Sequence, residues 1–168
     1  LKNEGIKPIK LDSKEGLALI NGTQMMSSIE SLSIIKAKRL ANVADMALAL
    51  SLEGLKGIRE PFDKRIHQLR PHPGQIKSAE NIRILVENSN LMEDRDDNRV
   101  QDSYTLRCGP QIHGATRDSI SHAIEIVERE INSVTDNPLI FPDSENVLSG
   151  GNFHGQPLAL SSDYLGMA

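Results

Sequence analysis

Polar side chains that could take part in binding or catalysis cluster in the stretch QDSYTLRCGPQIHGA, residues 101–115. Arg107 follows Tyr104 by three residues, so even one turn of helix would place both on the same face. A guanidinium can grip a planar carboxylate through two parallel hydrogen bonds, and a phenol can exchange a proton or hold a polar group. The same spacing also suits an Arg paired with a nearby Asp and a Tyr packed at a helix end. Spacing alone leaves both interpretations open.

A second candidate is the glycine-rich stretch SGGNFHGQP, residues 149–157. The adjacent Gly150 and Gly151 allow the backbone to approach a ligand closely, while Phe153 offers a ring face and His154 a titratable group. The alternative is a tight turn around a buried Phe153.

The histidines and the single cysteine do not suggest a metal site. Neither His67 with His72 nor His113 with His122 has a helical zinc spacing backed by a carboxylate signature. We therefore predict no metal, and we interpret Cys108 as a small buried apolar side chain. The sequence also lacks a glycine-rich phosphate-binding loop.

The residues named above must be positioned by helices, and the first third of the chain shows two helical patterns. Asp12 and Glu15 have capping-box spacing, which predicts a short helix over residues 12–20. The next residues, NGTQ, break that helix and expose Asn21.

A long helix is predicted from residue 24 to residue 52, longer than most globular helices and typical of a large helical assembly. Its apolar residues recur at helical spacings, at Ile29, Leu32, Ile35, Val43, Ala44, Ala47 and Leu48. We interpret three methionines of this segment as core filler, namely Met25, Met26 and Met46.

The middle of the chain is less regular. Residues 57–77 contain three prolines and predict an irregular connection, followed by a short helix near residues 78–87. The charged cluster EDRDDNR, residues 93–99, predicts a solvated loop without chemistry, because its carboxylates alternate with Arg.

The last third predicts a helix, a small hairpin and a second helix. A stripe over residues 111–134 is formed by Ile120, Ala123, Ile124, Val127, Ile131 and Val134. Two short apolar runs around a Pro-Asp-Ser turn predict a β-hairpin near residues 138–149, and Pro157 suits the first turn of a final helix. The fold class is therefore mainly α, with long bundled helices and one small hairpin.

Composition limits the kinds of molecule that this protein can bind. The 168 residues suffice for one domain, and a net charge of -4 with both signs dispersed argues against nucleic acid or an anionic membrane surface. No segment approaches the roughly 18 apolar residues needed to span a bilayer, and the first ten residues lack the apolar core of a signal peptide. With a single Cys as well, we expect a cytoplasmic protein acting on small molecules or binding other protein chains.

Five motifs together carry a family resemblance. GLALINGTQ, EPFDKRIHQLRPHPGQ, QDSYTLRCGPQIHGA, SVTDNPLIF and SGGNFHGQP, in this order, resemble the aromatic amino acid lyase family over nearly the whole chain from about Asp12. The resemblance implies a mostly helical homotetramer whose electrophilic prosthetic group, methylideneimidazolone, forms from an internal Ala-Ser-Gly. The strings RCGPQ and NGTQ favour the branch that eliminates ammonia from L-histidine to give urocanate.

The same resemblance implies roles for individual residues. Asn21 would hydrogen-bond the prosthetic group or the substrate amine, and Tyr104 would lie beside the electrophile and assist departure of the amine. Arg107 would clamp the substrate carboxylate, Gln101 would support that site, and Phe153 would pack against it.

One departure from the family pattern changes the expectation for this chain. Ala-Ser-Gly does not occur in the sequence, and the final apolar pattern stops while still running. We therefore expect an internal segment of the central helical domain of an ammonia-lyase, truncated at both ends and inactive alone. Two alternatives stay open: a segment of a phenylalanine or tyrosine ammonia-lyase or aminomutase, and a non-catalytic helical module that mediates subunit contacts.

Overall fold

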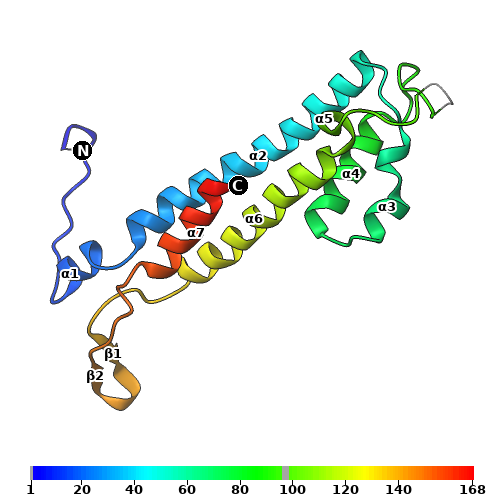
Figure 1. Ribbon diagram of the computed structural model, residues 1–168. Coiled ribbons are helices and arrows are strands. Elements are labelled where there is room, and N and C mark those ends of the chain that lie inside the picture. The colour runs from blue at the N-terminus through cyan, green and yellow to red at the C-terminus, as the bar shows by residue number, and fades with distance from the viewer. Residues whose placement is uncertain (1, 96–98) are drawn as a thin grey trace.

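Two long helices form the body of the protein. The computed structural model describes residues 2–95 and 99–168; residues 96–98 of the charged cluster lie outside this part. Helix α2 (Gln24–Gly54) and helix α6 (Gly109–Glu130) lie side by side and run in opposite directions (Figure 1). Helix α7 (Gln156–Met167) packs along α6 and α2, so the three helices form the elongated bundle that the sequence predicts.

The prediction of a rod over residues 24–52 is confirmed, but its buried face is not the predicted stripe. The buried residues of α2 are Ser27, Glu30, Ile34, Ala41, Asp45, Leu48, Ala49 and Leu52. Of the predicted stripe only Leu48 is buried, while Ile29, Leu32, Ile35 and Val43 are exposed. Two faces of α2 are apolar, and periodicity does not show which one meets α6.

The methionines of α2 are likewise not core residues within this chain. Met25, Met26 and Met46 are all exposed, which corrects their interpretation as core filler. All three lie on the side of α2 that stays exposed in the described part of the chain.

Small and aliphatic side chains build two hydrophobic clusters. One lies where α2 meets α6 and α7 and contains Ile34, Ala41, Ile120, Ala123, Val127 and Leu158. The other lies toward the carboxyl end of α2 and contains Leu48, Ala49, Leu52, Phe62, Ile82, Val86, Met92 and Leu106.

The carboxyl end of α2 is enclosed by several short helices. The predicted irregular connection over residues 57–77 instead contains η2 (Glu60–Phe62), α3 (Lys64–Gln68) and the start of α4 (Pro73–Leu85). Two of the three prolines that suggested a loop, Pro61 and Pro73, stand in the first turns of η2 and α4, where a missing N–H costs nothing. Helix α4 thus begins five residues earlier than expected.

Helix α4 crosses α6 at a point of very close backbone approach. A Cβ on Gly114 would lie 2.4 Å from the Cα of Gln75, and a Cβ on Gly74 would lie 2.1 Å from the Gly114 carbonyl oxygen. The Gly74 N–H also donates to Asp118 Oδ1 at 2.7 Å. The packing of α4 on α6 therefore requires glycine at both positions.

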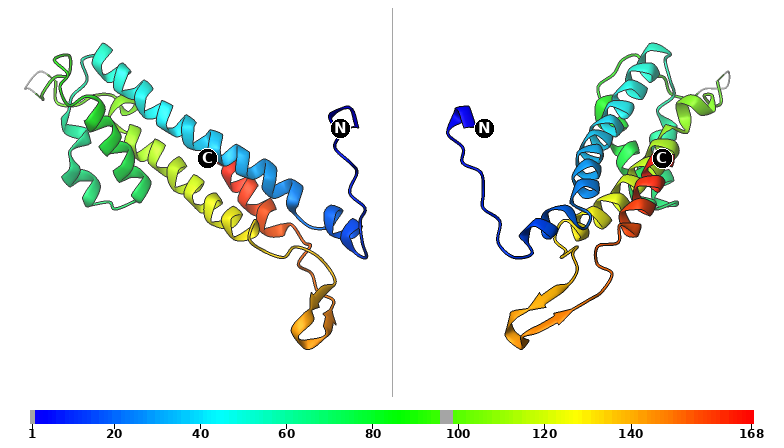
Figure 2. Two further views of the ribbon diagram at one scale, coloured as in Figure 1. Left: turned by 180° about the vertical axis from the view of Figure 1, so that it is seen from behind. Right: turned by 90° about the vertical axis from the view of Figure 1, so that its left-hand side faces the viewer.

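The other end of the molecule carries η1 (Lys2–Glu4), α1 (Glu15–Ile20) and the hairpin. Strands β1 (Leu139–Phe141) and β2 (Asn146–Leu148) pair antiparallel around η3 (Pro142–Ser144), as predicted, and project away from the helices (Figure 2). Helix α1 begins at Glu15 rather than at residue 12. The Glu15 carboxylate does accept from the Asp12 N–H at 2.6 Å, but the Asp12 side chain bonds Ser13 instead of closing the box.

Helix α6 ends at Glu130, so the predicted stripe residues Ile131 and Val134 lie beyond it and are exposed. Cys108 is half-buried rather than buried, because it lies at the junction of α5 (Tyr104–Arg107) and α6. Among the described residues, no helix combines the length and apolar character needed to cross a membrane.

Candidate functional site

Helix α5 brings Tyr104 and Arg107 together. Its single turn stacks the Arg107 guanidinium over the Tyr104 ring, with Cζ 4.5 Å from the ring centroid. Arg107 Nε donates to the main-chain oxygen of Asp102 at 3.0 Å. The two side chains share one face of the turn, as their spacing predicts.

The alternative for this pair was an Arg107 bound to a nearby Asp and a Tyr104 packed at a helix end. In residues 2–95 and 99–168, Arg107 forms no ion pair with any carboxylate, and the Tyr104 hydroxyl makes no hydrogen bond. Tyr104 is also 72% exposed, which is not the packing of a tyrosine at a buried helix end. Within this part of the chain, the outer nitrogens of the guanidinium and the phenol are available to a ligand.

The loop before α5 is held by a buried carboxylate. Asp102 Oδ2 accepts from the Ile58 N–H at 2.7 Å, and Oδ1 accepts from Arg99 Nη2 at 2.5 Å. Because Asp102 thereby holds its own main chain in place, the carbonyl that receives Arg107 Nε is fixed as well. Asp102 thus positions the guanidinium without binding it through its side chain.

The Arg107 side chain lines a cleft of about 610 Å³, together with Gln101 and Gln111. Sequence reasoning did not single out Gln111, although it is the last residue of RCGPQ. Its Oε1 is buried and has no hydrogen-bond partner among the described residues. A buried acceptor of this kind needs a donor, so Gln111 is a further candidate for contact with a bound molecule.

Asn21 lies at the other end of α2. Its Nδ2 donates to Asp136 Oδ1 at 3.0 Å, and Asp136 also pairs with Lys14 and accepts from the Asn137 N–H. The hydrogen bonds from Lys14, Asn21 and the Asn137 main chain lower the pKa of Asp136 to about 2. Asp136 therefore stays ionised and orients the Asn21 amide. It belongs to the motif SVTDNPLIF, but its role was not predicted.

The glycine loop lies beside Asn21. Gly150 N–H donates to Asn137 Oδ1 at 2.7 Å, which ties the loop to the Asp136 segment. Phe153 is 42% exposed, so the alternative of a turn built around a buried Phe does not describe this loop. His154 Nδ1 accepts from the Gln156 N–H at 3.2 Å and marks the entry to α7.

The segments that carry the predicted site residues therefore lie at opposite ends of the bundle (Figure 1). Asn21 and Phe153 lie where α2 begins, whereas Gln101, Tyr104 and Arg107 lie near its carboxyl end. At 1.5 Å per residue, the intervening part of α2 measures about 40 Å. A single copy of this chain does not bring all five residues to one small molecule.

A buried polar network lies between the two groups. Asp45 is almost inaccessible and accepts hydrogen bonds from Ser78, Asn81, His113 and Arg117, at 2.6 to 2.9 Å. Burial alone raises the pKa of Asp45, but these hydrogen bonds outweigh it, and the pKa is lowered overall. The network links α2, α4 and α6, so its role is to fix their relative positions. Across the described ranges, no three His, Cys, Asp or Glu side chains are arranged to hold a metal ion.

Comparison with known proteins decides the family. The sequence pattern of the family described as aromatic amino acid lyase matches residues 1–168. The chain belongs to the aromatic amino acid lyase family. Histidine ammonia-lyases from Natranaerobius thermophilus and Caldanaerobacter subterraneus subsp. tengcongensis are each 55% identical to it over 168 residues.

Solved structures agree on the fold of this lyase segment. Tyrosine aminomutase from Streptomyces globisporus matches 99% of the chain with a TM-score of 0.93 and 37% identity. Histidine ammonia-lyase from Trypanosoma cruzi matches 99% with a TM-score of 0.86 and 40% identity. The chain spans 33% of the length of the two bacterial relatives and 35% and 30% of these two structures.

Proposed function

We propose that this chain is part of an ammonia-lyase that converts L-histidine to urocanate, and that it supplies residues of the substrate site. The observation that carries the proposal is the Tyr104–Arg107 pair: the guanidinium lines a cleft and, among the described residues, forms no ion pair with a carboxylate. The identity to histidine ammonia-lyases supports L-histidine as the substrate. In this proposal the chain is an internal segment of the central helical domain of a cytoplasmic enzyme.

Arg107 binds the substrate carboxylate in this proposal. Its Nε is held by the Asp102 carbonyl, so the outer nitrogens present their donors in a fixed direction. Gln101 lines the same cleft and supports the carboxylate, and Gln111 offers a buried acceptor nearby. The carboxylate and the amino group of an amino acid can thus both be contacted by residues of α5 and of the segments that flank it.

The prosthetic group implied by the family is methylideneimidazolone, an electrophile that activates the amino acid for loss of ammonia. The available side chains fit such a group chemically, because Asn21 is an amide held by Asp136 and the Tyr104 hydroxyl makes no hydrogen bond among the described residues. Asn21 would donate a hydrogen bond there. Tyr104 would exchange a proton with the departing amine, and Phe153 would cover the site.

These residues can meet only across copies of the chain. Asn21 and Tyr104 lie at opposite ends of α2, about 40 Å apart along the helix. Two bundles lying antiparallel would set the Asn21 end of one copy against the Arg107 end of another. The exposed apolar face of α2 offers the surface for such an assembly, which supports the proposed homotetramer.

A chimera tests the function directly. This chain would replace the matching third of the Natranaerobius thermophilus histidine ammonia-lyase, and urocanate formation from L-histidine would be followed by absorbance. We expect the chimera to form urocanate and the 168-residue chain alone to form none, because the sequence contains no Ala-Ser-Gly to supply the electrophile. Turnover of phenylalanine or tyrosine instead of histidine would favour the other branches of the family. A folded chimera inactive on all three substrates would leave the oligomerisation module as the better explanation.

A further inference from the structure

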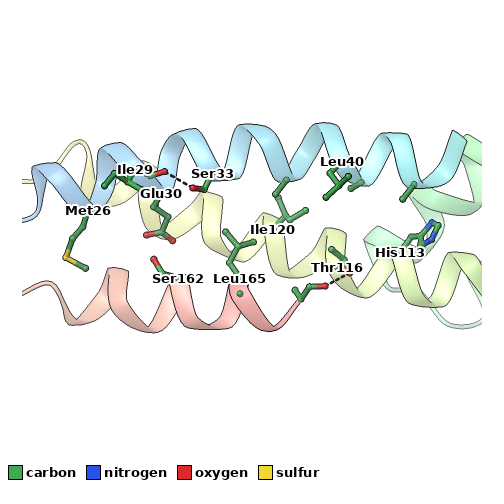
Figure 3. Close-up of a pocket in the computed structure, with 15 residues that line it drawn as sticks. Met26, Ile29, Glu30, Ser33, Leu40, His113, Thr116, Ile120, Ser162 and Leu165 are labelled. Carbon is green, nitrogen blue, oxygen red and sulfur yellow. Dashed lines mark hydrogen bonds between the residues drawn. The ribbon is translucent and has the colours of Figure 1, made fainter. Parts of the chain in front are cut away.

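Asp136 is a buried carboxylate that contacts a residue of the proposed substrate site. It lies between α6 and β1 and is 9% exposed. Its Oδ1 accepts from Asn21 Nδ2 at 3.0 Å and from the Asn137 N–H at 2.7 Å, and its Oδ2 pairs with Lys14. None of these residues lines the apolar groove between α2, α6 and α7 that Figure 3 shows. The cluster around Asp136 is therefore a separate polar site, and both carboxylate oxygens have partners in this chain.

The turn that carries Asn21 is fixed against the segment that carries Asp136. Gly22 adopts a φ of 101°, and a Cβ there would lie 1.9 Å from the Thr135 carbonyl oxygen. The buried Thr23 hydroxyl donates to Glu130 Oε1 at 2.7 Å. The main chain that follows Asn21 therefore has little freedom, and the backbone holds the Asn21 side chain beside the carboxylate.

The charge of Asp136 decides which end of the Asn21 amide faces it. An ionised carboxylate only accepts hydrogen bonds, whereas an amide has donors on its nitrogen and an acceptor on its oxygen. The hydrogen bonds from Lys14, Asn21 and the Asn137 main chain lower the pKa of Asp136 to about 2, so the group is ionised at neutral pH. A flipped amide would set its oxygen against the carboxylate, where two acceptors meet without a donor. Asn21 Nδ2 is therefore held toward Asp136, and Asn21 Oδ1 is turned away from it.

The outward-facing oxygen of Asn21 limits what this side chain can recognise. Asn21 Oδ1 accepts no hydrogen bond from any described residue. A carbonyl oxygen can only accept, and a cationic donor gives it the stronger hydrogen bond. The protonated amino group of an amino acid is such a donor. Of the two contacts that the family resemblance allows Asn21, the oxygen therefore suits the substrate amine, while the second Nδ2 hydrogen remains for the prosthetic group.

We propose that Asp136 is a positioning residue, which holds the Asn21 amide so that its Oδ1 faces the substrate amine. This inference rests on the proposed function, because it assigns one of the two possible contacts of Asn21 within that site. Asp136 acts through Asn21 and does not itself contact the substrate. Asp136→Asn would replace the carboxylate by an amide that donates as well as accepts, so it would no longer select one orientation of Asn21.

NMR of the unmodified 168-residue chain tests the orientation without any reaction. The side-chain NH₂ signals of Asn21 are identified by their loss in Asn21→Ala. We expect one of the two hydrogens to exchange with water about tenfold more slowly than those of the exposed Asn90. Asp136→Asn should weaken this protection, and the matched control Asp163→Asn, at an exposed position of α7, should keep it. Equal exchange at Asn21 and Asn90, or protection unchanged in Asp136→Asn, would overturn the proposal.

A double-mutant cycle in the chimera tests the role in the reaction. Asp136→Asn should lower kcat/KM for L-histidine by about tenfold, through the loss of one oriented hydrogen bond. In the Asn21→Ala background the same change should alter kcat/KM by no more than about twofold, because the group through which Asp136 acts is gone. A carboxylate that only stabilised the fold would lower kcat/KM equally in both backgrounds. Asp163→Asn should leave kcat/KM unchanged in either background.

The two experiments separate this inference from the proposed function. A folded chimera that forms no urocanate would contradict the proposed function and with it the contact to the substrate amine, whereas the NMR measurement would still decide how Asn21 is oriented. An active chimera in which Asp136→Asn is close to wild type, or equally harmful with and without Asn21, would overturn the positioning role and leave the proposed function standing.

Discussion

At the residue scale, Arg107 carries the most direct prediction. In the chimera, Arg107→Ala should lower kcat/KM by roughly thirtyfold to several thousandfold, the equivalent of about 2 to 5 kcal/mol, because a charge-assisted pair with the substrate carboxylate is lost. Arg107→Lys should lose less, since an ammonium keeps the attraction but not the two-point orientation. Steady-state kinetics on correctly folded variants measures both.

Tyr104→Phe is the informative contrast to the Arg107 variants. It keeps the ring on which the guanidinium stacks and deletes only the hydroxyl, so its effect should fall on kcat more than on KM. An Arg107→Ala variant close to wild type, or a Tyr104→Phe variant altered only in KM, would contradict the assigned roles.

The buried His67 should make the free energy of unfolding depend on pH. It is buried, with Nε2 near the Pro61 carbonyl at 3.1 Å and Nδ1 near Gln75 Nε2 at 3.1 Å. Burial lowers the pKa of His67, although the Pro61 carbonyl opposes that shift. Below about pH 6.5 the unfolded chain therefore binds more protons than the folded one, and the free energy of unfolding decreases as pH falls.

Urea unfolding of the 168-residue chain between about pH 7.5 and 5 measures this slope. His67→Gln should flatten it, because an amide can keep one hydrogen bond but does not titrate. The matched control is His72→Gln at an exposed position, which should leave the slope unchanged. An unchanged slope in His67→Gln would show that other groups cause the pH dependence.

At the scale of elements, the crossing of α4 and α6 is the most sensitive contact. Gly114→Ala should destabilise the protein by about 1 to 3 kcal/mol, because the new methyl would meet the main chain of Gln75, which cannot rotate away. Gly54→Ala is the control: nothing lies within 4 Å of its new Cβ, so we expect no loss of stability. Equal free energies of unfolding for the two variants would contradict the close approach.

Most elements could be predicted from the sequence, but not which face of each is buried. The α2 rod, most of α6 and the hairpin follow from local periodicity and turn chemistry, which act over a few residues. The short helices around residues 60–77 were missed because Pro61 and Pro73 were interpreted as breakers, although proline also starts helices. Asp45 was missed because its partners come from α4 and α6, more than thirty residues away along the chain.

At the scale of the whole molecule, the exposed apolar face of α2 predicts self-association. Leu32, Leu40, Val43 and Leu50 are all more than half exposed, and a continuous apolar face of this kind normally marks an interface. The 168-residue chain should associate as its concentration rises. Because association covers the apolar face, each chain should then bind less of a hydrophobic dye. Light scattering at increasing concentration measures the association, and a strict monomer that binds no dye would count against it.

The sequence by itself determined the family, the helical class and the candidate residues, because five motifs stand in a characteristic order and helical periodicity is a local property. Only the tertiary structure decided where those residues lie. It set Asn21 before the start of α2 and the Tyr104–Arg107 turn near its carboxyl end, about 40 Å apart along the helix, because each residue of a helix adds a constant rise. It also decided that Glu30 and Asp45 are buried while Ile29 and Leu32 are exposed, since burial depends on which helix packs against which face.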